Sequence, residues 1–167
     1  MGSRVLRLTA AQLFMPMVLI CLSLMDVTLQ AEVRLLMEID NPSPEVVRAV
    51  QSAVAWFDKV KITGLRIEKV PAEPVEFKYH YSDFDYVEVK DPNAPPLWAR
   101  YYDLETERPI FCNRDGKITR NFSDLQRERR TGYPWYGYWP AKLLDKEYPV
   151  WQKKWAPDDN VLIDRNH

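Results

Sequence analysis

Apolar residues recur at steps of three or four between residues 46 and 60, which places them on one face of a helix: Val46, Val47, Val50, Ala53, Val54, Phe57 and Val60. The residues before this run are typical of a helix start. Ser43 is a natural N-cap, Pro44 suits the first helical position, and Glu45 is favourable beside the positive end of the helix dipole. The pattern therefore predicts a helix that begins at Ser43 and ends near Lys61.

The segments on either side of this helix give weaker patterns. A short helix is expected just upstream, over the apolar residues 35–39. Downstream, residues 62–70 include an alternating section that predicts a short strand. Residues 71–96 are rich in proline and polar side chains and are interpreted as loop, with a candidate strand at Tyr86–Lys90.

The second half of the chain is predicted from its turn and helix-start signals. Residues 113–116 (NRDG) form a turn signal. Ser123 is expected to open a capping box and a short helix that runs to Arg130, with Gly132 at its exit. Pro140 is expected to start another helix, which Pro149 interrupts. Periodicity thus predicts a mainly α domain with long irregular loops.

Composition limits the classes of protein that the chain can belong to. Its 167 residues are 46% hydrophobic and 28% charged, which fits a globular protein with a core. The net charge of −1 gives no global field that would attract nucleic acid, so any anion binding must be local. One cysteine, Cys112, follows the N-terminal segment, which excludes an internal disulfide and a cysteine-rich zinc site.

The N-terminus has the features of an export signal. Arg4 and Arg7 precede an apolar run from Leu13 to Leu24, which is too short to span a bilayer and has the length of a signal core. We therefore divide the chain into a signal peptide (1–31), a folded part (32–155) and a flexible tail (156–167). This division predicts a secreted or periplasmic protein with no membrane contact once the signal is cleaved.

Arginines and aromatic residues are the candidate chemistry. Guanidinium groups grip carboxylates in bidentate fashion, and tyrosine and tryptophan faces stack on sugar rings. Together they would suit an acidic polysaccharide. The alternative is that each arginine is an ordinary surface charge paired with Asp103, Glu105 or Glu107, and that the aromatic cluster at 133–139 only packs. The arginines of interest are Arg34, Arg66, Arg100, Arg108 and Arg114.

Three segments resemble the C-terminal half of the catalytic domain of pectate lyases of polysaccharide lyase family 10. They are NPSPEVVRAVQSAVAWF (41–57), PPLWARYYDLETERPIFCNRDG (95–116) and ERRTGYPWYGYWPAKLLDKEYPVWQKKW (128–155). The resemblance covers about residues 34–155. It implies part of an α/α barrel of helical hairpins with long loops, in a secreted enzyme that cleaves de-esterified polygalacturonate (pectate) by calcium-assisted anti β-elimination.

The resemblance also implies roles for individual residues. The proton on C5 of galacturonate lies beside a carboxylate, so its removal builds up negative charge that cations stabilise. Arg34 is the best match to the arginine proposed as the base in that family. Arg100 and Arg114 match arginines that bind the substrate carboxylates, and Tyr133 and Tyr136 are the candidate stacking faces.

The chain departs from the family pattern in its length. The N-terminal half, which supplies several barrel helices and most of the calcium ligands, has no counterpart, so we expect no metal ligands in this sequence and an incomplete, truncated barrel. Two functions follow as hypotheses. One is a pectate lyase, whose activity as an isolated chain is open; the alternative is a non-catalytic remnant that still binds acidic polysaccharide.

Overall fold

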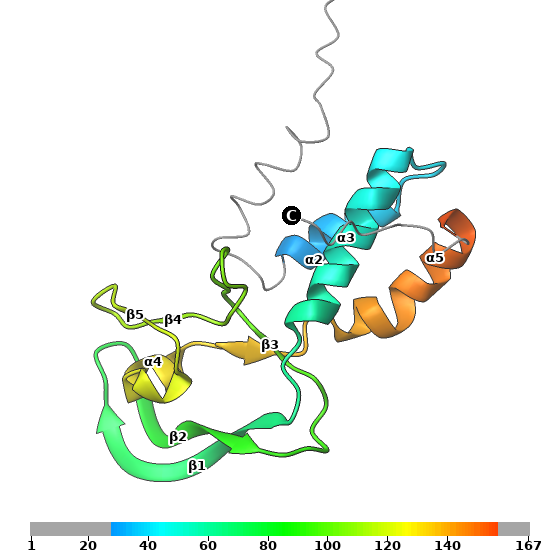
Figure 1. Cartoon of the computed structure of the whole chain (residues 1–167). Coiled ribbons are helices and arrows are strands. Elements are labelled where there is room, and N and C mark those ends of the chain that lie inside the picture. Colours follow the sequence, from blue (N-terminus) through cyan, green and yellow to red (C-terminus); the bar gives the residue numbers. More distant parts are fainter. Residues whose placement is uncertain (1–27, 157–167) are drawn as a thin grey trace, which may run out of the picture.

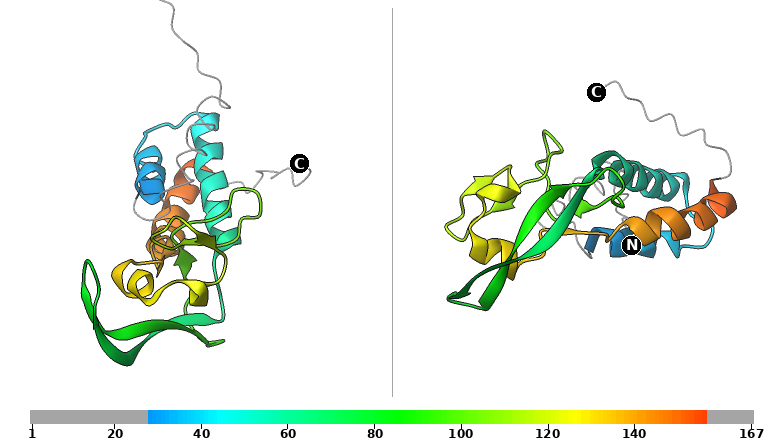
Figure 2. Two further views of the ribbon diagram at one scale, coloured as in Figure 1. Left: turned by 90° about the vertical axis from the view of Figure 1, so that its left-hand side faces the viewer. Right: turned by 90° about the horizontal axis from the view of Figure 1, so that it is seen from below.

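The computed structural model describes residues 28–156, which form a helical part and a strand part side by side (Figures 1 and 2). The helical part contains the helices α2, α3 and α5, and the strand part contains all the strands and the short helix α4. The elements in chain order are α2 (Thr28–Met37), α3 (Pro44–Val60), β1 (Leu65–Glu76), β2 (Tyr81–Lys90), β3 (Trp98–Ala99), β4 (Phe111–Cys112), β5 (Ile118–Thr119), the 3-10 helix η1 (Phe122–Asp124), α4 (Arg127–Gly132), β6 (Tyr136–Gly137), the π-helix η2 (Leu143–Glu147) and α5 (Tyr148–Trp155).

Helix α3 follows its sequence pattern closely. It starts at Pro44 with Ser43 as N-cap, and its C-cap is Lys61, as predicted. Its apolar face packs against α2 and α5 in one core cluster, in which Val50 and Phe57 are fully buried. The predicted upstream helix exists too, but it begins at Thr28 and ends at Met37.

The segment that follows the β1–β2 hairpin closes the C-terminal end of α3. The last four carbonyl groups of a helix have no partner within the helix. The indole Nε1 of Trp98 donates to the Phe57 carbonyl at 2.8 Å, and the Tyr102 hydroxyl donates to the Val60 carbonyl at 3.0 Å. The same hydroxyl accepts the Ala99 N–H at 3.0 Å. Residues 98–102 are therefore fixed to the helix at both ends, and Arg100 lies between the two anchors.

A long antiparallel hairpin overturns the predicted fold class. Residues 71–96, interpreted as loop apart from the candidate strand Tyr86–Lys90, contribute half of β1 and all of β2, which pair from Leu65↔Lys90 to Glu76↔Tyr81. The register shifts between Pro71 and Val75, where prolines that cannot donate a ladder hydrogen bond are tolerated. The prediction of a mainly α protein and part of an α/α barrel is wrong for the described residues, which combine helices with three small two-stranded antiparallel sheets.

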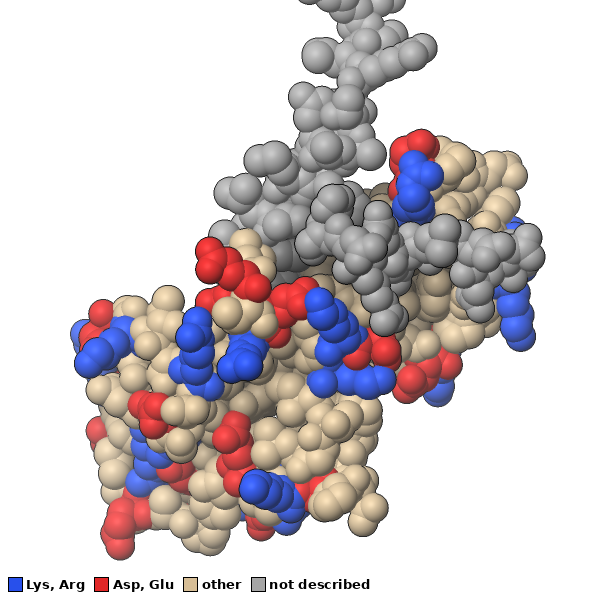
Figure 3. Space-filling view, viewed as in Figure 1, with Lys and Arg blue, Asp and Glu red and all other residues tan. Residues whose placement is uncertain are grey.

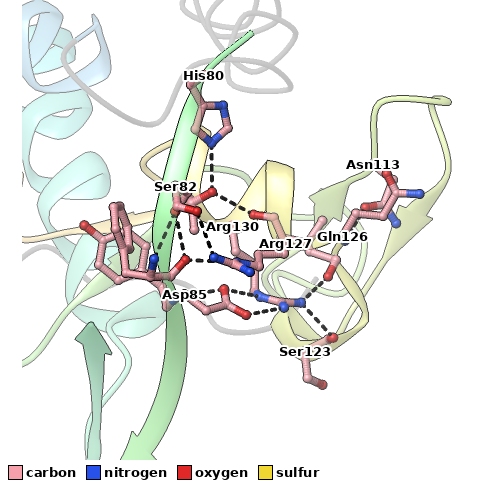
Figure 4. A network of polar contacts seen from close by, with 12 residues as sticks. His80, Ser82, Asp85, Asn113, Ser123, Gln126, Arg127 and Arg130 are labelled. Carbon is pink, nitrogen blue, oxygen red and sulfur yellow. Dashed lines mark hydrogen bonds and ion pairs between the residues drawn. The ribbon is translucent and has the colours of Figure 1, made fainter. Parts of the chain in front are cut away.

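Two arginines of α4 hold the hairpin against the rest of the strand part (Figure 4). The Arg130 guanidinium makes a bidentate pair with Asp85 of β2: its Nε donates to Oδ1 at 2.9 Å and its Nη2 donates to Oδ2 at 2.6 Å. Arg127 donates to the carbonyls of Ser82 and Phe84, both at 3.0 Å. Since the Asp85 and Arg130 side chains are 15% and 17% exposed, this pair is largely shielded from water.

The C-terminal helix continues past Pro149, contrary to expectation. The π-helix η2 runs directly into α5, and Pro149 is the second residue of α5. Leu143 is fully buried. The predicted capping box at Ser123 is wrong: a 3-10 turn covers residues 122–124, and α4 starts at Arg127 with Gln126 as N-cap.

Most of the predicted signal peptide and tail lies outside the described residues. Within them, Leu29 of α2 packs in the core at 5% exposure, and Ala156 is 7% exposed. None of the helices within residues 28–156 has the length and apolarity that crossing a membrane requires.

We predict that Tyr102→Phe destabilises the protein although it removes only one oxygen atom. The change leaves the buried Val60 carbonyl and Ala99 N–H without a partner, which costs about 1–3 kcal/mol. Urea denaturation followed by circular dichroism measures the change. Tyr81→Phe is the control, because Tyr81 is 55% exposed; equal stability of both variants would contradict the anchoring role.

The Asp85–Arg130 pair predicts a pH-dependent contribution to stability. Burial would raise the pKa of Asp85, but hydrogen bonds from Arg130 and the Tyr86 N–H outweigh it and lower the pKa below 3.8. A carboxyl whose folded pKa is depressed stabilises the fold above its unfolded pKa, and the contribution disappears as pH falls through the folded value.

Asp85→Asn should therefore lower the free energy of unfolding by roughly 2–4 kcal/mol at neutral pH, and by progressively less below about pH 4. Urea titrations of both proteins from pH 7 to pH 2.5 measure this difference. Asp58→Asn, in an exposed pair with Lys61, should change stability by at most about 0.5 kcal/mol. A constant difference for Asp85→Asn across this range would contradict the assignment.

Candidate functional site

The short pairing of β3 with β6 brings two distant motifs together. Trp98 pairs with Gly137 and Ala99 with Tyr136, and the Arg100 N–H donates to the Trp135 carbonyl at 2.8 Å. The arginine of the first motif therefore lies beside the aromatic run of the second.

Two guanidinium groups lie against one tyrosine ring. The Arg100 Cζ is 4.7 Å from the centre of the Tyr133 ring, and the Arg129 Cζ is 5.1 Å from it. Arg100 also lies 5.5 Å from the Trp139 ring, and Arg129 lies 5.0 Å from the Trp135 ring. The negative faces of aromatic rings attract cations, so these contacts orient both guanidinium groups. We call Arg100, Arg129 and Tyr133 the arginine–tyrosine cluster.

Neighbouring groups fix the members of this cluster. The Arg129 Nε donates to the Cys112 carbonyl at 3.1 Å, and the Trp135 indole donates to the Arg129 carbonyl at 2.8 Å. The Tyr133 hydroxyl lies 2.5 Å from the Tyr101 hydroxyl, and the two rings are nearly parallel, 6.3 Å apart. Tyr133 is therefore held by its hydroxyl as well as by its ring.

An open groove of about 480 Å³ runs along the aromatic segment that follows α4. Tyr133 and Tyr136 both line it, together with Trp135 and Tyr138, and its other wall includes Ile67 and Tyr86 of the hairpin. The Tyr136 hydroxyl donates to Glu88 Oε1 at 2.5 Å. Burial, and then Glu88, raise the pKa of Tyr136 far above its ordinary value, so this hydroxyl stays protonated.

Arg114 reaches the same region from the turn between β4 and β5. The predicted turn is present, with Gly116 at φ 83° and its N–H donating to the Asn113 carbonyl at 3.0 Å. Arg114 Nη2 lies 2.7 Å from Glu128 Oε1, and its guanidinium lies over the Tyr79 ring. Arg129 donates to the Cys112 carbonyl, two residues before Arg114, so the backbone of Arg114 lies near the arginine–tyrosine cluster.

Arg34 lies elsewhere, in the helical part. It extends from α2, and its Nε is 2.6 Å from Glu147 Oε2. It lines a separate hollow with Trp151, Lys154 and other residues of α2 and α5. Burial alone would raise the pKa of Glu147, but hydrogen bonds from Arg34 and Lys142 lower it overall. The structure thus brings Arg100, Tyr133 and Tyr136 together, with Arg114 beside them, and places Arg34 apart.

The remaining arginines of interest have structural partners. The Arg66 guanidinium pairs with Glu68 and Asp91. Arg108 contributes a backbone contact, in which its carbonyl accepts the Asp103 N–H. Acidic and basic side chains are interspersed over the visible face of the strand part (Figure 3). No broad single-sign surface marks the site there, so its chemistry lies in a few positioned groups.

The described residues do not fit a calcium ion. Within residues 28–156, no three His, Cys, Asp or Glu side chains gather as metal ligands. Calcium takes six to eight oxygen ligands. Two carboxylates of β2 already have partners in the protein: Asp85 pairs with Arg130, and Glu88 accepts a hydrogen bond from the Tyr136 hydroxyl. A calcium site would need carboxylates from outside the described residues.

Arg129 is the site residue that sequence reasoning missed. Its neighbour Arg130, by contrast, forms an ion pair with Asp85. The four-residue spacing between Arg129 and Tyr133 is no signal, because α4 ends at Gly132 and the Tyr133 backbone is extended.

Comparison with known families identifies the chain. A family model described as pectic acid lyase matches residues 25–144, which is more than half of the sequence. The chain belongs to the pectic acid lyase family. The family resemblance stated from the sequence is therefore confirmed.

Two solved structures from Cellvibrio cellulosa are similar to this pectic acid lyase family chain. The first is an aspartate-to-alanine mutant of a family 10 polysaccharide lyase in complex with trigalacturonic acid; it is 26% identical, with a TM-score of 0.54, and the match covers 71% of this chain and 33% of that one. The second is a family 10 polysaccharide lyase; it is 25% identical, with a TM-score of 0.50, and the match covers 68% of this chain and 32% of that one. This chain spans about a third of their length. No curated protein matches it.

Proposed function

We propose that this chain binds de-esterified polygalacturonate through the arginine–tyrosine cluster and acts in its cleavage by β-elimination. The observation that carries the proposal is the convergence of Arg100 and Arg129 on Tyr133 beside an aromatic groove. Family membership and the trigalacturonic acid bound by the similar Cellvibrio lyase support this substrate class.

The cluster suits the charge that this reaction develops. Removing the C5 proton of a galacturonate leaves a carbanion whose charge spreads onto the adjacent carboxylate, and the C4–O bond then breaks. Guanidinium groups that are already oriented stabilise that charge without reorganising as it forms. Arg100 and Arg129 would bind the carboxylate, and the rings of Tyr133 and Tyr136 would contact the sugar.

Calcium enters this proposal as a requirement of the family resemblance. Because the described residues do not fit the ion, we assign none of them as a ligand and no step to the metal. For the location we propose a secreted or periplasmic protein, on the basis of the basic and apolar N-terminal sequence.

A non-catalytic role is the second candidate. This chain spans about a third of the length of the similar lyases, and the proposed base is not beside the proposed binding groups. Polysaccharide binding requires only the aromatic groove and the arginine–tyrosine cluster beside it. Binding would therefore persist in a remnant that has no lyase activity.

We expect the chain to form unsaturated products from polygalacturonate, detected by their ultraviolet absorbance, and a calcium chelator to abolish them. Arg100→Ala and Arg129→Ala should each weaken binding roughly 10- to 100-fold, because each removes a charge-assisted contact. Affinity electrophoresis in pectate gels and isothermal titration calorimetry measure this binding.

Arg48→Ala is the matched control, because Arg48 is exposed on α3 in a pair with Glu45. Binding without product would support the non-catalytic role over the lyase. If the wild type shows neither product nor binding, or if Arg48→Ala weakens binding as much as Arg129→Ala does, the proposed site is wrong.

Arg34 is our proposed base, and its position gives a sharp test. If it abstracts the proton, Arg34→Ala should lower product formation roughly 100-fold or more and leave pectate binding unchanged. The Arg34 guanidinium is paired with Glu147 in a hollow separate from the aromatic groove, so the assignment requires this pair to separate and the substrate to reach that hollow. Lys142→Ala, which removes the other cation on Glu147, is the control; unchanged turnover in Arg34→Ala would refute the assignment.

A further inference from the structure

The turn of the β1–β2 hairpin is attached to α4. The Phe77 N–H donates to the His80 carbonyl at 2.9 Å, which closes the turn around Lys78 and Tyr79. His80 Nε2 lies 2.8 Å from the Thr131 hydroxyl oxygen. That hydroxyl donates to the Arg127 carbonyl, so the imidazole is the donor to it.

A glycine allows this attachment. A Cβ added at Gly132 would lie 2.7 Å from His80 Cε1, closer than side chains approach one another. The imidazole therefore packs directly on the backbone of α4. Phe77 adds a further contact, because the Arg127 guanidinium lies 5.9 Å from its ring. The turn thus has a fixed position relative to α4, and so does Tyr79.

The Arg114 guanidinium lies over the ring of Tyr79. The Arg114 Cζ is 4.2 Å from the ring centre, and the Lys78 ammonium is 5.1 Å from it. The Tyr79 residue is 60% exposed, so burial does not explain the contact. Arg114 therefore has two restraints, Glu128 at one edge of its guanidinium and Tyr79 against one face.

We propose that Tyr79 is a positioning residue that presents Arg114 to a carboxylate of an acidic polysaccharide. This rests on the function proposed above and adds the hairpin turn to the binding site. A free arginine side chain loses considerable rotamer freedom when it binds, and a side chain already held in place loses less. Tyr79 contributes by this route, without touching the ligand.

The test is isothermal titration calorimetry with trigalacturonate on the full chain and its variants. Tyr79→Ala should weaken binding about two- to five-fold, the range of one exposed cation–ring contact. Tyr79→Phe keeps the ring and should bind like the wild type. Tyr81→Ala, at an exposed tyrosine in the same hairpin, is the matched control and should also bind like the wild type.

A double variant separates positioning from general damage. Arg114→Ala should weaken binding on its own, and adding Tyr79→Ala should weaken it no further, because the group that Tyr79 positions is gone. In the ligand-free chain, the Arg114 Cδ protons should show an upfield ring-current shift in NMR spectra that Tyr79→Ala removes and Tyr79→Phe preserves.

The outcomes distinguish this proposal from the proposed function. Wild-type binding that Tyr79→Ala leaves unchanged, or additive losses in the double variant, overturns the positioning role alone. The absence of wild-type binding overturns the proposed function and the carboxylate role of Arg114 with it. An unshifted Arg114 signal in the wild type overturns the Tyr79 contact whatever the ligand does.

Discussion

The unpaired carbonyl groups at the end of α3 are the constraint on which the site depends. Trp98 and Tyr102 satisfy two of them, and both side chains are buried in doing so. Burial raises the pKa of Tyr102 to about 12, so its hydroxyl remains a donor at any physiological pH. Arg100 lies between these anchors, and β3, which begins at the first of them, pairs with β6. A helix end thereby determines where a guanidinium group meets the aromatic segment.

A second attachment joins the β1–β2 hairpin to α4 through two arginines that have a structural role. Arg127 and Arg130 bind the backbone carbonyls and the Asp85 carboxylate of β2, whereas Arg129 between them turns toward Tyr133. Three arginines within four residues of one short helix thus divide between holding the hairpin and lining the site. Sequence position alone does not separate these roles, because what differs is the direction in which each side chain leaves the helix.

Local signals predicted the parts of the fold that depend on local physics. Ser43 and Pro44 mark the start of α3, and Gly116 marks the β4–β5 turn, because in each case the backbone conformation depends on the residue that adopts it. The long hairpin was missed because its prolines suggest loop and its turn, Lys78-Tyr79, contains no glycine or asparagine. Arg100 and Arg114 came from the family resemblance, and Tyr133 and Tyr136 came from the aromatic cluster in the sequence. Their convergence could not be predicted from spacing, because it requires the pairing of β3 with β6 across more than thirty residues.

The π-helix before Pro149 changes which side chains face the core. Leu143 and Trp151 are eight residues apart, which in a regular α-helix turns them about 80° away from each other. A wide turn takes up one extra residue, so the two are offset by only about 20°, as if they were seven apart. This is consistent with the burial of both side chains in the same cluster, at 0% and 6% exposure. If η2 kept all its residues but became a regular α-helix, α5 would rotate by about 100° about its axis and Trp151 would turn away from the side of the helix on which Leu143 lies, whereas deletion of one residue from η2 would preserve the direction of Trp151.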